Sequence, residues 1–233
     1  METRTQRDYF PILLNLKDQP CLVIGGGMVA YRKVGSLLQA GARVRVISPE
    51  TVAQLEALAD SGDIALEKRH YRSGDLKNCR LAFAATNQRA VNEACRKEAM
   101  ETGVLLNVVD VPDLCDFIMP AVHQQGDLLL MVCSQGKSPM LSKRIRKEFE
   151  KRYGPAYGYV SRVLGHMRTQ AFKDFSDIHQ RKALFQHLIE EGPIDQALTA
   201  SEKNAETILW KAYEAKAMVL KQEQNTTCQD VGQ

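Results

Sequence analysis

The sequence predicts an α/β fold with a doubly wound parallel sheet, followed by a small α+β segment and a C-terminal helical region. Two observations support this. Up to about residue 109, short apolar runs typical of buried strands alternate with segments of helical periodicity. Beyond residue 157 the strand signal disappears. Alternation of this kind favours a parallel sheet with helices on both faces.

Five short apolar runs are the expected strands of the sheet. The first, residues 21–24, ends directly in glycines, as a buried parallel strand can. The others lie at residues 44–47, 64–66, 81–85 and 104–109. Helical spacing is found at residues 29–38, 51–60 and 90–102. Gly41 is expected to end the first of these helices.

The pattern changes after Pro112. Residues 117–119 and 128–132 are predicted strands, joined by a turn at residues 125–127. Ser138 is expected to cap a helix that has Pro139 at its first position. Residues 157–221 are predicted to be helical, with a break at residues 192–193. The polar tail that follows is expected to be disordered.

Composition excludes several classes of function. The net charge is +3, and basic residues are interleaved with acidic ones, which argues against nucleic-acid binding. No apolar run approaches the roughly 20 residues that span a bilayer, and the N-terminus lacks a secretory signal. We therefore expect a cytoplasmic protein. The six cysteines and five histidines are dispersed, so no protein metal site is predicted.

A glycine-rich segment, Gly-Gly-Gly-Met-Val-Ala at residues 25–30, follows the first strand and opens a helix. Gly25 permits a tight turn, Gly27 lets the backbone approach a phosphate, and Ala30 replaces the third glycine of the dinucleotide pattern. The phosphates would lie at the helix N-terminus. The segment therefore predicts a Rossmann-like dinucleotide site. The alternative is a glycine-rich turn with no ligand.

The end of the second strand lacks the acidic residue that often binds the adenosine ribose. Ser48 occupies this place, followed by Pro49 and Glu50. Ser48 can make a weaker contact, and Glu50 lies further along. The choice between NAD and NADP is therefore left open by this motif.

Polar residues follow the fourth and fifth strands, at the edge where open α/β sheets bind ligands. Thr86 and Asn87 can bond a cofactor or cap the next helix, and both interpretations remain open. Asp110 ends the fifth strand, where a carboxylate can act as a base. It can equally be a turn residue before Pro112.

Six segments, in order, resemble the precorrin-2 dehydrogenase family, which includes the dehydrogenase/ferrochelatase part of siroheme synthases. The resemblance spans about residues 9–150. The helical remainder carries no sharp motif. The segments are residues 9–12 with Leu16, residues 25–33, residues 84–87, residues 107–110, residues 117–120 and residues 134–139.

The resemblance implies NAD-dependent oxidation of precorrin-2 to sirohydrochlorin and, in some members, Fe²⁺ insertion to give siroheme. It implies that Asp110 is the catalytic carboxylate, and that Met28, Val29, Pro49 and Glu50 lie beside the cofactor. It also implies a homodimer built by the central segment, with the active-site cleft between that segment and the cofactor domain.

The implied substrate carries many carboxylates, so its pocket needs cations. Lys137 and Arg144 are candidate substrate-binding residues. Ser134 matches a cleft serine that is phosphorylated in some members, and its alternative is a plain loop serine. The basic run at residues 143–147 is either an anion-facing patch or a solvated helix face. Tetrapyrrole nitrogens would hold the Fe²⁺, so no protein metal cage is needed.

Four parts are expected along the chain: an NAD-binding domain at residues 1–112, a dimerisation segment at 113–153, a helical domain at 154–222 and a disordered tail at 223–233. Two other functions remain open. A regulatory protein that senses NAD(H) without chemistry would explain the glycines but not Asp110. A chelatase with a vestigial cofactor loop would not explain the intact glycines.

Overall fold

The computed structural model describes residues 9–230, with side chains described up to Glu223. Contacts divide the chain into two compact units, Met1–Met119 and Pro120–Gln233. The sequence analysis put this boundary earlier, at residue 112. Its further division of the second part at residue 153 stays a prediction.

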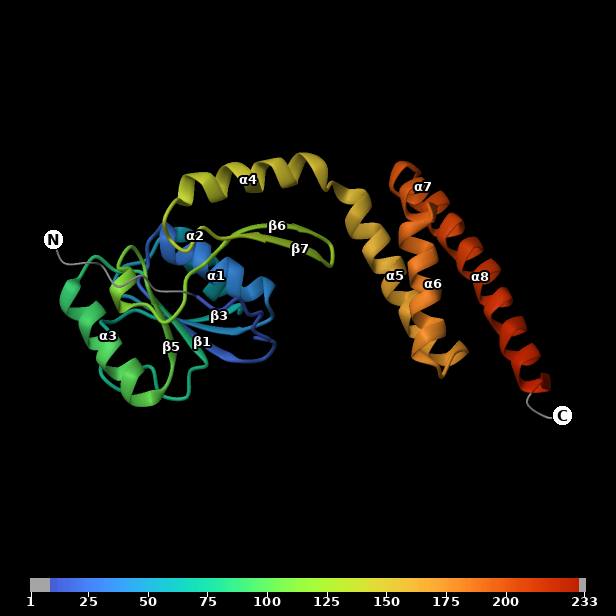
Figure 1. The fold of residues 1–233 in the computed structure, drawn as a ribbon. Coiled ribbons are helices and arrows are strands. Elements are labelled where there is room, and N and C mark those ends of the chain that lie inside the picture. The colour runs from blue at the N-terminus through green and yellow to red at the C-terminus, as the bar shows by residue number, and fades with distance from the viewer. Residues whose placement is uncertain (1–8, 231–233) are drawn as a thin grey trace. The chain divides into compact units, whose positions relative to one another are not determined.

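The first unit is a five-stranded parallel sheet in the order β3-β2-β1-β4-β5, flanked by helices (Figure 1). The doubly wound α/β prediction is thus confirmed. Its elements are β1 (Pro20–Ile24), α1 (Met28–Gln39), β2 (Arg43–Ile47), α2 (Ala53–Asp60), β3 (Ile64–Glu67), β4 (Leu81–Ala84), α3 (Arg89–Thr102), β5 (Leu105–Val108) and the short 3₁₀ helix η1 (Pro112–Leu114).

Side chains of the central strand alternate between two apolar cores. Cys21 and Val23 of β1 face a cluster that includes Val34 of α1. Leu22 and Ile24 face a second cluster that includes Cys95 of α3. Burial on both faces explains why β1 is a continuous apolar run in the sequence, since neither face meets water.

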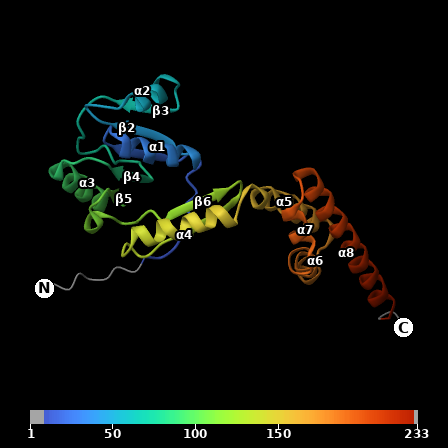
Figure 2. The ribbon, with the colours of Figure 1, turned by 90° about the horizontal axis from the view of Figure 1, so that it is seen from above.

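The second unit combines a two-stranded hairpin with helices. Its elements are β6 (Ala121–Gln125), β7 (Leu128–Val132), α4 (Pro139–Arg152), α5 (Pro155–Asp174), α6 (Ile178–Glu190), α7 (Pro193–Thr199) and α8 (Glu202–Asp230). Figure 2 shows α4 running along β6. The helices α5 to α8 share one apolar core. Ser138 caps α4 as expected: its hydroxyl oxygen accepts a hydrogen bond from the Leu141 N–H.

Two predictions about this half were wrong. Residues 117–119 are not a strand, and β6 begins only at Ala121. The Phe117 carbonyl instead accepts a bond from Asn107 Nδ2, and the Phe117 ring packs edge-on against Phe83 in the first unit. Pro120 has no N–H to donate to a ladder, so the hairpin starts after it.

The predicted disordered tail was also placed too early. Helix α8 continues through Asp230, whereas disorder was expected from about residue 222. Neither glycine nor proline interrupts the sequence from residue 202 to 230, so nothing forces the helix to end. Residues 231–233, the rest of the predicted tail, lie outside the described residues.

Candidate cofactor and catalytic site

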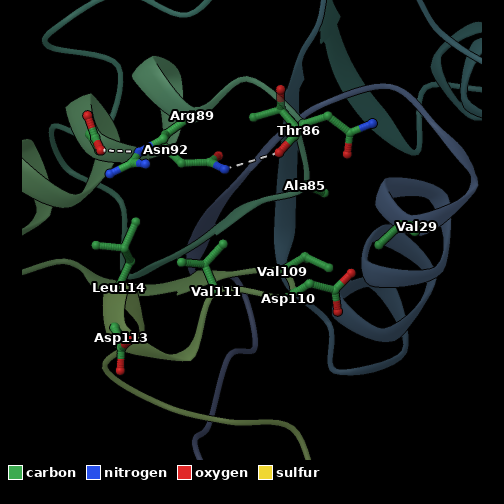
Figure 3. Close-up of a pocket in the computed structure, with 12 residues that line it drawn as sticks. Val29, Ala85, Thr86, Arg89, Asn92, Val109, Asp110, Val111, Asp113 and Leu114 are labelled. Atoms are coloured by element: carbon green, nitrogen blue, oxygen red, sulfur yellow. Dashed lines mark hydrogen bonds and ion pairs between the residues drawn. The ribbon is translucent and has the colours of Figure 1, made fainter. Parts of the chain in front are cut away.

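The strand order reverses between β1 and β4, and open α/β sheets bind ligands beyond the carboxyl ends of the strands at such a point. A pocket of about 600 Å³ lies there. It is lined by Val29 of α1, the loop after β4, the first turn of α3 and the segment after β5 (Figure 3). Four residues predicted from the sequence line it together: Val29, Thr86, Asn87 and Asp110.

The three glycines after β1 have different roles. Gly25 has φ +121°, and a Cβ there would lie 2.2 Å from the Ala85 carbonyl oxygen. A Cβ on Gly26 would lie 1.9 Å from the Glu50 carbonyl oxygen, a constraint that the sequence analysis missed. A Cβ on Gly27 would meet nothing within 4 Å. Gly25 and Gly26 thus allow the chain after β4 and after β2 to lie close to the glycine loop, whereas Gly27 faces open space.

The N-terminus of α1 is open to an anion. Its N-cap residue, Gly27, has no side chain to accept from the first N–H groups, and the first turn holds no acidic residue. The free N–H groups and the helix dipole therefore favour a negatively charged group. Met28 is half exposed there, while Ala30 is fully buried against the sheet.

The end of β2 shapes the glycine loop. Ser48 is buried, and its hydroxyl donates to the Glu50 carbonyl oxygen at 2.6 Å. The Val52 N–H donates to the Gly26 carbonyl oxygen at 2.8 Å. Ser48, Pro49 and Glu50 are not among the residues that line the pocket. The Ser48 hydroxyl therefore bonds the backbone of the loop after β2 and does not face the pocket.

The loop after β4 is held by α3. Thr86 Oγ1 accepts a bond from the N–H of Gln88, which is the N-cap residue of α3. Asn92 Nδ2 donates to the Thr86 carbonyl oxygen at 3.1 Å (Figure 3). Thr86 thus both shapes the helix start and lines the pocket. Asn92 was missed, although it lies six residues after Thr86 in the first turn of the helix.

Asp110 is an exposed residue with φ +60°. The Val111 N–H donates to the Val108 carbonyl oxygen at 3.2 Å, which closes a turn with Asp110 at its third position. Positive φ at that position defines a type II turn, and aspartate tolerates it better than most residues. In Figure 3 the carboxylate points toward α1, where Val29 lies.

The Cys115 side chain contacts the backbone at both ends of this turn. Its buried Sγ accepts from the Val108 N–H at 3.2 Å and lies 3.1 Å from the Val108 carbonyl oxygen. It also lies 3.3 Å from the Val111 carbonyl oxygen. These contacts hold both ends of the turn, so the position of Asp110 is fixed by the protein interior.

Charged side chains line the pocket and lie on the neighbouring helix α1. Arg89 and Glu93, both exposed, form an ion pair at 2.7 Å on α3. Lys33 of α1 is half-buried, with its Nζ 5.1 Å from the centre of the Phe83 ring. Burial lowers the pKa of Lys33, and the charge of Arg32 lowers it further, while Asp110 and Cys115 act in the opposite direction. The sequence analysis assigned no role to Lys33.

The predicted substrate-binding residues lie in the second unit. Ser134 Oγ accepts from the Ser138 N–H at 2.9 Å and from the Ser142 hydroxyl at 3.2 Å, so it is part of the N-terminal end of α4. Lys137 is exposed. Arg144 is 81% exposed and lies 3.6 Å from Glu148.

The residues at the pocket fit a dinucleotide. Asn92 lines the pocket and is buried, and its Oδ1 has no hydrogen-bond partner within the described part of the chain. A buried acceptor of this kind normally has a partner. Together with the open Gly27 and the uncapped α1, it suits a ligand that has both phosphates and hydrogen-bond donors. Among the described residues, no group of three or more His, Cys, Asp or Glu side chains is arranged to hold a metal ion.

The fold and this edge of the sheet define a dinucleotide-binding protein of the Rossmann type. In agreement, residues 12–121 match a protein-family model described as "Putative NAD(P)-binding". The chain is 38% identical over 210 residues to the siroheme synthase of Methylococcus capsulatus, covering 90% of this chain and 44% of that protein. It is 35% identical over 206 residues to the siroheme synthase of Nitrosococcus oceani, with 88% and 44% covered.

A solved structure named "SirC, precorrin-2 dehydrogenase" has the same fold, with a TM-score of 0.73 at 24% identity. The match covers 88% of this chain and all of that one. In sequence the chain is similar to the siroheme synthases over the part of them that it matches. It spans less than half of their length. No helix of the described residues is both long and apolar enough to span a membrane.

Proposed function

We propose that the protein oxidises precorrin-2 to sirohydrochlorin with NAD⁺ as the acceptor, with release of NADH and a proton. The observation that carries the proposal is that Asp110 and Val29 line one pocket at the switch point of the sheet. A carboxylate is thereby held next to the helix that opens the glycine-rich loop. The relatives' names, siroheme synthase and precorrin-2 dehydrogenase, support the choice of substrate.

In this mechanism, each part of the pocket has a separate task. The N–H groups at the start of α1 bind the phosphates, and Asn92 holds the Thr86 loop beside the rest of the cofactor. When bound, NAD⁺ supplies the acceptor for two electrons and one hydrogen. Asp110 takes up the proton that the ring loses in the same oxidation. Its braced turn sets the carboxylate before substrate arrives, so little reorganisation is needed.

The proposal extends to Fe²⁺ insertion, because siroheme contains iron and the relatives are named for its synthesis. Pyrrole N–H protons must leave as the metal enters, and Asp110 is a pocket carboxylate that can accept them. We assign the substrate's carboxylates to Ser134, Lys137 and Arg144. The exposure of both cations supports this assignment.

We also propose a homodimer in the cytoplasm. The hairpin exposes the apolar side chains of Val122, Leu129 and Met131, which a second copy would cover. The five cysteines whose side chains are described form no disulfide with one another, which suits a reducing compartment. Sedimentation at micromolar concentration should give twice the chain mass, and a monomer would contradict the dimer.

The test uses purified protein, precorrin-2 and NAD⁺ under anaerobic conditions, with the absorption spectrum of sirohydrochlorin as the readout. Product should form only with NAD⁺, and a later addition of Fe²⁺ should change the spectrum faster than in a protein-free control. NADP⁺ in place of NAD⁺ decides the cofactor. Binding of NAD⁺ without any product would favour a sensor of NAD(H) instead.

A further inference from the structure

Lys33 lies on the same side of α1 as the pocket residue Val29, although it does not itself line the pocket. It follows Val29 by four residues, and residues at this spacing share one face of a helix. Val29 lines the pocket that contains Asp110. The Lys33 stem is half-buried, and its ammonium group lies over the ring of Phe83 in β4, 5.1 Å from the ring centre.

Packing fixes the position of this cation. Phe83 is buried, and its ring meets Phe117 edge-on at 5.5 Å between centres. The Phe117 carbonyl accepts from Asn107 of β5, the strand that leads into the Asp110 turn. The Phe83–Phe117 contact therefore places the ammonium group, and Asn107 connects that contact to the strand that leads into the Asp110 turn. The attraction between a cation and the face of an aromatic ring also persists when water is removed.

The charged groups around Lys33 come from two elements. Arg32 precedes it on α1 and is exposed, whereas Asp110 and Cys115 belong to the segment after β5. Burial and Arg32 lower the pKa of Lys33, and Asp110 and Cys115 raise it. The charge of Asp110 thus acts on Lys33, which lies one helical turn beyond the pocket residue Val29.

A bound tetrapyrrole would remove water from Asp110. Loss of water disfavours a charged carboxylate, and a fixed cation nearby offsets that loss. A carboxylate must be ionised to accept a proton. This problem arises only if Asp110 is the base, so the inference rests on the proposed function.

We propose that Lys33 is a positioning residue for Asp110, whose ammonium group keeps the carboxylate ionised when substrate covers the pocket. Lys33→Met removes the charge and keeps much of the stem. It should lower kcat roughly 10- to 100-fold, a part of the usual contribution of a general base. The Kd for NAD⁺ should stay within about twofold of the wild-type value.

Two control variants test whether the effect requires a positive charge at residue 33 or only a positive charge somewhere nearby on α1. Lys33→Arg keeps a cation and should retain at least about a third of kcat. Arg32→Met removes a cation from the next, exposed position and should leave kcat within about twofold. Equal losses in Lys33→Met and Arg32→Met, or in Lys33→Met and Lys33→Arg, would overturn the proposal.

The pH dependence of kcat distinguishes an electrostatic role of Lys33 from a purely structural one. Lys33 acts as a cation, so its effect is present below its pKa and lost as the pH rises through it. Because that pKa is lowered, kcat should fall at a pH below the ordinary lysine value of 10.5. Lys33→Arg should move this fall to higher pH, and Lys33→Met should abolish it. A fall that is the same in all three proteins would contradict the proposal.

A measurement independent of turnover uses the side-chain NMR signal of Lys33. Its pKa should drop further in Asp110→Asn, because the carboxylate that raises it is gone. An unchanged pKa overturns the role of Lys33 whether or not the enzyme is active. If the pKa of Lys33 drops in Asp110→Asn but the wild-type protein shows no dehydrogenase activity, the interaction between Lys33 and Asp110 is supported and the proposed function is refuted. This test also holds if Lys33→Met fails to fold.

Discussion

Both units of the chain have apolar cores, but they differ in how far buried polar groups support their loops. In the first unit, polar groups are buried under the loops: Glu98 and Asp75 both fix the segment between β3 and β4. In the second, α5 to α8 close around apolar side chains such as Met167 and Leu209. Buried polar groups demand specific partners, so they fix loop geometry in a way that apolar contacts do not. The cofactor pocket lies in the unit that has this kind of support.

The largest effect should follow removal of the Glu98 carboxylate. It accepts from the Leu76 N–H at 2.8 Å, the Gly74 N–H at 2.9 Å and the Tyr71 hydroxyl. Glu98→Ala would leave these donors unpaired and should lower the free energy of unfolding by about 3–5 kcal/mol in urea titration.

Glu98→Gln is the matched control, since it keeps a carbonyl oxygen as an acceptor. It should cost about half as much as Glu98→Ala. If Glu98→Ala were as stable as wild type, the carboxylate would not be what fixes this segment.

Asp75 should have the next largest effect, and an effect that depends on pH. Burial alone would raise the pKa of Asp75, but hydrogen bonds from Arg69 and from the Arg72 N–H lower it below the ordinary 3.8. Its stabilising effect is therefore complete above about pH 5 and is lost as the pH falls through the lowered value. Asp75→Asn should cost about 2 kcal/mol at neutral pH.

Urea titrations of Asp75→Asn at several pH values check this sign. The difference from wild type should shrink as the pH falls from 3.8 to the lowered pKa of the folded protein, because Asp75 of the unfolded chain then binds a proton before Asp75 of the folded chain. A difference that grows toward acid pH would contradict the assignment.

A smaller effect is expected in the helical unit. The Tyr213 hydroxyl donates to Asp174 at 2.7 Å and ties α8 to α5. The surrounding core is apolar, and in the variant Asp174 would still have Lys221 as a partner, whose Nζ lies 3.4 Å from Asp174 Oδ1. Tyr213→Phe should therefore cost only about 1 kcal/mol in thermal or urea unfolding. A loss as large as that of Glu98→Ala would mean that polar contacts hold this unit as well.

The smallest effect, with the opposite sign, is expected at the pocket itself. Asp110 has φ +60°, which glycine adopts without strain. Asp110→Gly should keep or raise the melting temperature, with a gain of at most about 1 kcal/mol, while dehydrogenase turnover is lost. The thermal melt of Cys115→Ala, which removes the brace from the same turn, provides the contrast and should fall.

The sequence was sufficient for features that depend on neighbouring residues. The strand alternation, the turn at Gly25 and the place of Asp110 at a strand end all follow from local patterns. Features that depend on contacts between distant segments were not predicted. Gly26 is constrained by Glu50, the Asp110 turn by Cys115, and Asn92 has a buried acceptor that no periodicity reveals.

The hairpin shows the same limit. An apolar run at residues 117–119 has the composition of a strand, but the Phe117 side chain packs against the core of the first unit. The strand therefore begins after Pro120, which has no N–H to donate to the ladder. The start of the hairpin was wrong for this reason, although its second strand was predicted at residues 128–132.

The central claim is that Asp110 is the proton acceptor in an NAD⁺-dependent oxidation. The most direct measurement compares wild type and Asp110→Asn for kcat with precorrin-2 and for NAD⁺ affinity by titration. We expect kcat to fall by about 10²- to 10⁴-fold, with the Kd for NAD⁺ within about twofold of wild type. A variant that turns over at the wild-type rate would contradict the claim and leave Asp110 as a turn residue.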